Sequence, residues 1–204
     1  FNLSDYKSEI IKYDDNAATK LLSSYYPGQT LGEIWGYVVD GYYTVDDFVD
    51  TSSWQLKEGV TSINGYNVRP GDVKFKNLRD DDTSTNVITS GDNTFDNPGD
   101  RKVIGNTTPR YQYGINLGMN YAGFDLNVIL QGTGKRDYWI SNVLTFPMNG
   151  DNFVPLFEGL SDYWMPKDPD NGDWSAVNPN AKYPRYVWAD QLGTANYYRT
   201  STMF

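Results

Sequence analysis

YQYGINLGMNYAGFDLNVILQ, residues 111–131, alternates apolar and polar side chains along almost its whole length. Successive side chains point to opposite faces of a β-strand, so a period of two predicts strand rather than helix. The pair Ala122-Gly123 interrupts the alternation and predicts a two-residue turn. We therefore expect a β-hairpin with one polar and one apolar face, and only Ile129 departs from the pattern. The apolar face is expected to carry Tyr111, Tyr113, Ile115, Leu117, Met119, Tyr121, Phe124, Leu126, Val128 and Leu130.

The apolar face is also ordered along its length, with aromatic residues at its ends and aliphatic residues between them. Tyr113 and Tyr121 are separated by about 27 Å along a strand, at ~3.4 Å per residue. For a strand tilted by about 40°, this covers roughly 20 Å along the membrane normal, close to the apolar band of an outer-membrane barrel. Aromatic rings at both ends would then lie at the two lipid–water interfaces.

Periodicity alone does not say whether an apolar face points to lipid or into a protein core. A soluble β-sandwich or lipocalin-like barrel would bury Ile115, Leu117 and Leu126 inside. Strand length favours the membrane barrel, because its strands need about 9–11 residues whereas soluble strands usually have five or six. The connections also favour it, since a minimal turn is followed by the long irregular segment 132–196, and barrels combine short turns on one side with long loops on the other.

The composition excludes several classes of function. The 204 residues include no cysteine and no histidine, which excludes a disulfide scaffold, a Ser-His-Asp or Cys-His nucleophile and a His-ligated zinc. The net charge of −9 leaves no basic footprint for a nucleic acid. Aspartate greatly outnumbers glutamate, which together with abundant Gly, Asn and Tyr is typical of an all-β, loop-rich protein. No segment approaches the ~18 apolar residues of a transmembrane helix.

For the rest of the chain, the sequence predicts shorter elements. We expect a weakly alternating strand in 1–13, two short extended pieces in 31–45, a short helix near 45–51, a turn leading into a strand in 70–76, and loop over 77–110. Both ends of the chain are strand-like. Because lipid does not tolerate open sheet edges, we expect the chain to be a fragment of a larger barrel.

Four segments carry a family resemblance in their order and spacing. They are LGEIWGY at 31–37 with Asp40-Gly41; PGDVKFK at 70–76; DRKVIGN at 100–106 with Pro109; and YGINLG at 113–118 through GFDL at 123–126 to LQG at 130–132. Together they resemble the SusC/RagA family of TonB-dependent outer-membrane transporters of Bacteroidetes, from about residue 25 to the end of the chain. The resemblance implies that residues 1–204 form part of the C-terminal half of a large transmembrane β-barrel of the 22-stranded type, with long extracellular loops. The plug and TonB-contacting segment of the family are absent from this chain.

The resemblance also implies a function and partners. It implies import of oligosaccharide or peptide nutrients across the cell outer membrane, with no covalent chemistry and no cofactor. The implied partners are outer-membrane lipid, a SusD-like surface lipoprotein that closes the barrel mouth, and TonB through the missing plug region. The alternative is a soluble or surface-attached β-sandwich that binds carbohydrate through exposed aromatic residues. A third reading, a hydrolase using paired aspartates, has little support because chance supplies such pairs in Asp-rich loops.

Aromatic residues are the candidates for ligand contacts. Trp35 and Tyr37 could stack on sugar rings or peptide side chains, but we favour the alternative that they pack long loops against each other and against the partner lipoprotein. Trp164, Trp174 and Trp188 lie in the long segment 132–196, and we expect them to pack against other loops or the lid lipoprotein.

A calcium loop is the candidate metal site. Similar transporters often carry an Asp-x-Asn-x-Asp-Gly-like run near residues 77–82, and here the ligands would be Asn77 and Asp81. Arg79 occupies a ligand position between them and would repel a cation. We therefore favour a solvated acidic turn and expect neither a metal site nor catalytic residues.

Overall fold

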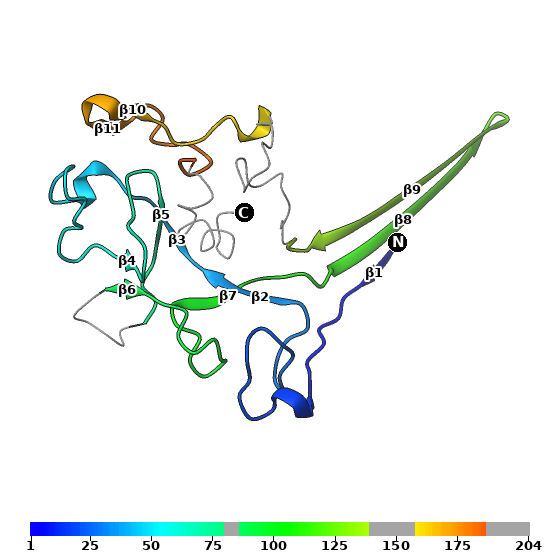
Figure 1. Cartoon of the computed structure of the whole chain (residues 1–204). Helices are drawn as coiled ribbons and strands as arrows, with labels where there is room; N and C mark the ends of the chain where they lie inside the picture. The colour runs from blue at the N-terminus through cyan, green and yellow to red at the C-terminus, as the bar shows by residue number, and fades with distance from the viewer. Residues whose placement is uncertain (80–85, 139–157, 187–204) are drawn as a thin grey trace, which may run out of the picture. The chain divides into compact units, whose positions relative to one another are not determined.

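A computed structural model describes residues 1–79, 86–138 and 158–186, and this part of the chain is all-β (Figure 1). The strands are β1 (Asn2–Ser4), β2 (Glu33–Tyr37), β3 (Val39–Tyr42), β4 (Ser62–Ile63), β5 (Val73–Phe75), β6 (Val87–Ile88), β7 (Arg101–Asn106), β8 (Arg110–Tyr121), β9 (Phe124–Lys135), β10 (Pro166–Asp168) and β11 (Asp173–Ala176). Single 3-10 turns are η1 (Asp14–Asn16), η2 (Val45–Asp47), η4 (Glu158–Leu160) and η5 (Pro169–Asn171). No helix among these residues has the length and apolar character to cross a membrane.

The chain forms two compact units. Of the described residues, the first unit contains 1–35, 94–96 and 103–138, and the second contains 36–79, 86–93, 97–102 and 158–186. Strands β2 and β7 pair with each other, and the division between the units falls within both strands.

The first unit is built on the long hairpin of β8 and β9, with β1 paired to β8 near the open end (Figure 1). The antiparallel register sets Leu117 opposite Val128 and Met119 opposite Leu126, so the apolar residues of both strands share one face. Asn116 lies opposite Ile129 on the other face. The hairpin therefore has the two faces that the alternation predicts, with Ile129 as the exception.

Two glycines of this sheet, Gly114 and Gly132, are covered by neighbouring side chains. The Tyr113 ring lies across Gly132, its partner in the register, where a Cβ atom would come within 2.4 Å of the ring. The Asn2 side chain covers Gly114 in the same way. Since a glycine contributes no side chain to a sheet, an aromatic cross-strand neighbour restores packing at that position.

The turn of the hairpin contains Ala122 at φ +50° and Gly123 at φ +86°. Two central residues with positive φ define a type I′ turn, in which asparagine and glycine are favoured and alanine is strained. We expect Ala122→Asn to raise the free energy of unfolding by about 0.5–1 kcal/mol, measured by urea titration in detergent. Gly123→Ala is the matched control and should lower it by about 1 kcal/mol. A loss of stability in Ala122→Asn would contradict this turn geometry.

The second unit packs around a core of aromatic and β-branched side chains. Strand β5 pairs with β3 in antiparallel fashion and β6 pairs with β4 in parallel fashion, and these short strands direct alternate residues inward. Val73 and Phe75 of β5 are fully buried. The core residues are Tyr37, Tyr43, Phe48, Ile63, Val68, Val73, Phe75 and Ile88.

The observed elements correct several expectations. The hairpin extends over Arg110–Lys135, beyond the expected 111–131. Residues 77–110 are not all loop, since β6 and β7 form by pairing with the distant strands β4 and β2. The expected loop 132–196 contains the paired strands β10 and β11. The expected helix near 45–51 is a single 3-10 turn, because Phe48 is extended, and of residues 1–13 only β1 is strand.

Candidate functional site

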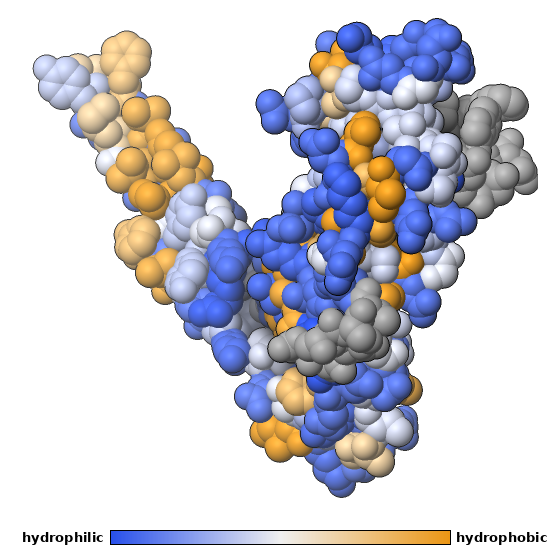
Figure 2. Space-filling view, turned by 90° about the vertical axis from the view of Figure 1, so that its left-hand side faces the viewer, coloured by the Kyte–Doolittle hydropathy of each residue, from blue (hydrophilic) through white to orange (hydrophobic). Residues whose placement is uncertain are grey.

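The apolar face of the β8–β9 hairpin is exposed. Leu117 and Leu126, in the middle of the strands, are 58% and 54% exposed, and Tyr121 and Phe124, beside the turn, are 76% and 81% exposed. Figure 2 shows hydrophobic residues gathered along this hairpin. Soluble monomers rarely expose contiguous apolar patches of more than a few hundred Å², so a surface of this kind indicates contact with lipid or with another protein.

The opposite face of the hairpin is mostly polar, with Ile129 as the exception. Asn116 and Asn120 of β8 and Asn127 and Gln131 of β9 lie on this face, and the Asn120 amide donates a hydrogen bond to the Asp125 carboxylate. Amides bind water well and are costly to expose to hydrocarbon. The two faces of the hairpin therefore suit two different environments, one apolar and one aqueous.

The hairpin lacks the core that a soluble β-sandwich requires. That alternative needs Leu117 and Leu126 to be buried, and both are more than half exposed. Ile115 is only half-buried. Within the described part of the chain, the buried hydrophobic residues lie outside β8 and β9.

A second feature lies in the second unit, where residues 158–186 pack against the turn before β5. The Trp164 ring is buried against Gly71, and a Cβ atom on Gly71 would come within 2.3 Å of it. Gly71 has φ +88°, a conformation that other residues rarely adopt. The Arg185 backbone N–H also donates to the Gly71 carbonyl oxygen at 3.0 Å. Glycine is therefore required at position 71 for both backbone conformation and packing.

A buried ion pair completes this docking. Arg185 Nε lies 2.7 Å from Asp72 Oδ1, and Arg185 Nη2 donates to Asp72 Oδ2 at 3.1 Å. The Arg69 backbone N–H donates to the same carboxylate at 2.8 Å. Burial raises the pKa of the Asp72 carboxyl, while the Arg185 guanidinium acts in the opposite direction. The single Nη2–Oδ2 hydrogen bond and the close contact between the two charges link the turn before β5 to residues 158–186, while Arg185 Nε is buried without a hydrogen-bond partner among the described residues.

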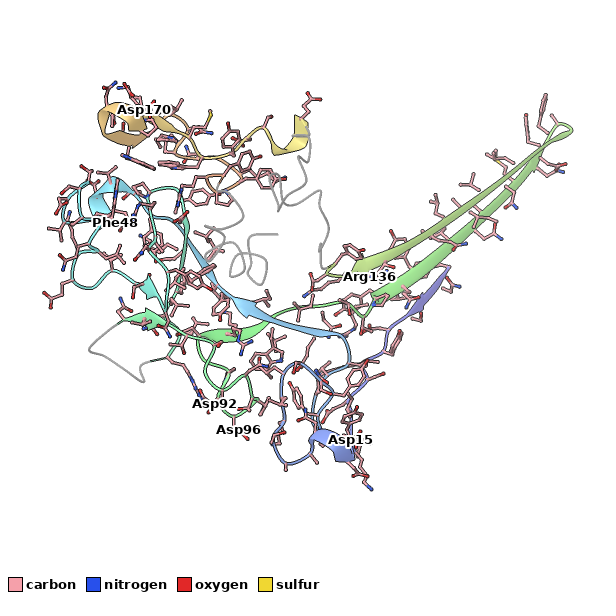
Figure 3. All side chains as sticks on the ribbon, viewed as in Figure 1. Asp15, Phe48, Asp92, Asp96, Arg136 and Asp170 are labelled. Atoms are coloured by element: carbon pink, nitrogen blue, oxygen red, sulfur yellow. The ribbon has the colours of Figure 1, made fainter. Side chains whose placement is uncertain are left out.

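Aromatic contacts hold the β10–β11 hairpin in the same unit. The Trp174 ring lies edge-on to Trp54, with 5.1 Å between ring centroids, and the Arg69 guanidinium lies 5.2 Å from the Trp54 ring centre. Figure 3 shows Asp170 on the short turn that joins β10 and β11. The expectation that Trp164 and Trp174 pack against other loops is confirmed, whereas Trp188 lies outside the described residues.

The two candidate ligand-binding residues, Trp35 and Tyr37, differ in how deeply they are buried. Tyr37 is buried in the core of the second unit, where its ring lies 5.4 Å from the Phe75 ring, so it presents no face to a ligand. Trp35 is half-buried, and its indole N–H donates to Glu33 Oε1 at 2.8 Å. The Tyr26 hydroxyl donates to the same oxygen, and burial raises the pKa of that hydroxyl above its usual range. Trp35 thus belongs to a packed hydrogen-bonded cluster of the first unit.

The side chain of Asn77, a candidate metal ligand, is already hydrogen-bonded to other groups of the protein. Its amide nitrogen donates to Asn86 Oδ1 at 2.9 Å, and its oxygen accepts from the Arg79 backbone N–H at 3.1 Å. The second candidate, Asp81, lies outside the described residues. Among the residues that the structure describes, no three carboxylates gather around a common point.

Asp72 and Arg185 were missed as candidate residues. Pro70-Gly71-Asp72 predicted only a turn, and nothing in the local sequence around Arg185 indicates a buried partner far away in the chain. The only sequence signal for Asp72 is that it directly precedes a short apolar strand. Aspartates are common at such positions in loops, so this signal does not identify a buried ion pair.

Comparisons with known proteins add one relationship. No family model matches the chain. The chain is similar to TonB-dependent receptor P3 of Formosa agariphila, with 24% identity over 211 aligned residues. The match covers 97% of this chain and 17% of the relative, so the chain spans about a sixth of the length of the protein it matches.

Proposed function

We propose that this chain forms part of the transmembrane β-barrel of a TonB-dependent transporter that imports nutrients across the outer membrane. The observation that carries the proposal is the β8–β9 hairpin, whose exposed apolar face has aromatic residues at both ends and whose opposite face is polar. Transmembrane strands need an apolar face toward lipid and a polar face toward the barrel interior. The similarity to a TonB-dependent receptor supports the same reading.

The finer proposal is a transporter of the SusC/RagA type in Bacteroidetes, within a barrel of the 22-stranded type. In that reading a SusD-like lipoprotein covers the barrel mouth, TonB acts through a plug, and the cargo is a glycan or a peptide. The docked segment 158–186 supports it, because buried Trp164 and the Asp72–Arg185 pair give an irregular segment the order that a protein interface needs. We propose transport without catalysis, since TonB-dependent receptors are transporters.

The proposal fixes the sidedness of two exposed positions. The turn at Ala122 should face the periplasm, and the β10–β11 turn should face the outside of the cell. Asp170→Cys should therefore react with a membrane-impermeant maleimide on intact cells, whereas Ala122→Cys should react only after the outer membrane is opened. Both side chains are exposed in the structure, so accessibility of the residue itself does not limit labelling.

The controls separate topology from expression. Both cysteine variants should label fully in detergent, and both should fractionate with the outer membrane. Labelling of the residue-122 cysteine but not the residue-170 cysteine on intact cells would invert the topology. Recovery of the protein in the soluble fraction would refute the membrane location and favour the carbohydrate-binding alternative.

A further inference from the structure

The turn that follows β4 carries an exposed Asn-Gly pair, Asn64-Gly65. These are the central residues of a turn closed by a 3.1 Å hydrogen bond from the Tyr66 N–H to the Ile63 carbonyl oxygen. Gly65 has φ +78°, as the third position of a type II turn requires. Among the described residues, neither the Asn64 side chain nor the Gly65 N–H takes part in a hydrogen bond.

An Asn-Gly pair in this state can react with itself. The backbone nitrogen of the glycine attacks the side-chain carbonyl carbon of the asparagine, which closes a five-membered succinimide ring and releases ammonia. Glycine permits this reaction most readily, since it has no Cβ to obstruct the approach and its backbone rotates freely. A Cβ atom added to Gly65 would meet nothing within 4 Å, so the space around the turn is open for the rearrangement.

A second Asn-Gly pair in the same unit holds the same reacting groups in hydrogen bonds. Asn171 Nδ2 donates to Asp168 Oδ2 at 2.8 Å, and the Gly172 N–H donates to the Pro169 carbonyl oxygen at 3.2 Å. Both residues of this pair are also exposed, so access to solvent does not distinguish the two sites. The third pair, Asn149-Gly150, lies outside the described residues.

We propose that Asn64 is a site of spontaneous deamidation in the folded protein. A bond forms between the Gly65 nitrogen and Asn64 Cγ, and the bond from Cγ to Nδ2 breaks. Hydroxide in the solvent removes the Gly65 N–H proton, and the departing nitrogen takes a proton from water and leaves as ammonia. Water then opens the succinimide at either carbonyl carbon, which gives aspartate or isoaspartate. Because hydroxide removes the proton, the rate rises with pH.

The isoaspartate product alters the strand pairing of the second unit. It lengthens the main chain by one methylene group directly after Ile63, which is buried in the core at 2% exposure. The Asn64 N–H donates to the Ile88 carbonyl oxygen at 3.4 Å, beside the parallel pairing of β4 and β6 (Figure 1). A longer main chain moves this hydrogen bond and the following turn out of register, so we expect the aged protein to be less stable.

The first test compares the two sites within one sample of folded protein. The full-length protein in detergent is aged at mildly alkaline pH and digested, and mass spectrometry measures deamidation of the peptides that contain Asn64 and Asn171. Reaction at Asn171 must first break two hydrogen bonds, one of them to a carboxylate, so Asn64 should deamidate at least about tenfold faster. Equal rates, or a faster reaction at Asn171, would overturn the proposal.

Unfolding separates the effect of the fold from that of the local sequence. In guanidinium chloride the hydrogen bonds of Asn171 and Gly172 are lost, so the two sites should react at similar rates. If the difference between the sites persists undiminished in the unfolded protein, neighbouring residues rather than the folded structure cause it, and the structural explanation is overturned.

Asn64→Gln tests the consequence for stability. Glutamine keeps the amide, but its extra methylene group disfavours ring closure, so this variant should not age at position 64. Ageing should lower the urea midpoint of the wild-type protein and leave that of Asn64→Gln unchanged. An equal loss in both proteins would place the damage elsewhere and overturn the proposed effect on β4 and β6. Neither measurement depends on insertion into a membrane, so this inference is tested separately from the proposed function.

Discussion

Asp72→Ala is expected to lower the free energy of unfolding by about 3–5 kcal/mol, because it leaves the Arg185 guanidinium buried without its partner. Asp72 is 3% exposed and joins two segments of the second unit, the turn before β5 and residues 158–186. Its loss should also release residues 158–186, so limited proteolysis should cut there first. The thermal unfolding midpoint of the detergent-solubilised protein measures the loss of stability.

The matched control for this variant is Lys167→Ala. Lys167 pairs with Asp173 in the same unit, but both side chains are largely exposed, so the loss should be at most about 1 kcal/mol. Asp72→Leu/Arg185→Met removes both charges and should be more stable than Asp72→Ala, because no buried charge remains unpaired. Equal stability of Asp72→Ala and the Lys167→Ala control would show that the ion pair does not hold residues 158–186 in place.

Leu117→Arg is expected to cost roughly 2–4 kcal/mol if the apolar face of the hairpin lies in lipid near the bilayer midplane. Leu117 lies in the middle of the exposed apolar face, opposite Val128. The cost arises because an arginine side chain there must be dehydrated or must distort the bilayer to reach water. The effect is measured as the fraction of the protein in the outer membrane that is folded. Folded protein is identified by its resistance to unfolding in detergent.

Asn127→Arg is the matched control for the membrane-facing surface. Asn127 is one residue from Val128 but lies on the polar face, opposite Gly118. A charge there would face the aqueous interior of the proposed barrel, so the change should stay within about 0.5 kcal/mol. A larger loss for Asn127→Arg than for Leu117→Arg would reverse the assignment of the two faces.

The candidate ligand residues show where local reasoning fails. Trp35 and Tyr37 are alike in sequence, as aromatic residues two positions apart in a glycine-containing extended piece. Tyr37 packs on Phe75 and is buried, whereas Trp35 is half-buried and bonded to Glu33. Which aromatic residue is covered depends on partners supplied by other segments, and aromatic character alone does not name those partners.

The strands that the sequence does not predict, β6, β7, β10 and β11, are missed for the same reason. Strands β6 and β7 carry no clear alternation of their own, and they form because β4 and β2 offer them backbone hydrogen-bond partners. The pair β10–β11 is flanked by prolines and aspartates that read as loop. Short strands depend on such pairing more than long ones, since few side chains contribute a periodic signal.

The all-β class, the two faces of the β8–β9 hairpin and its two-residue turn could all be predicted from local sequence. These are local properties, because side chains alternate with a period of two and Gly123 readily adopts a positive φ. The contacts of Asp72 with Arg185 and of Trp164 with Gly71 follow from the folded structure alone. Such pairs are far apart in the chain, and their contacts exist only after folding has closed the loops between them, which no local pattern of residues specifies.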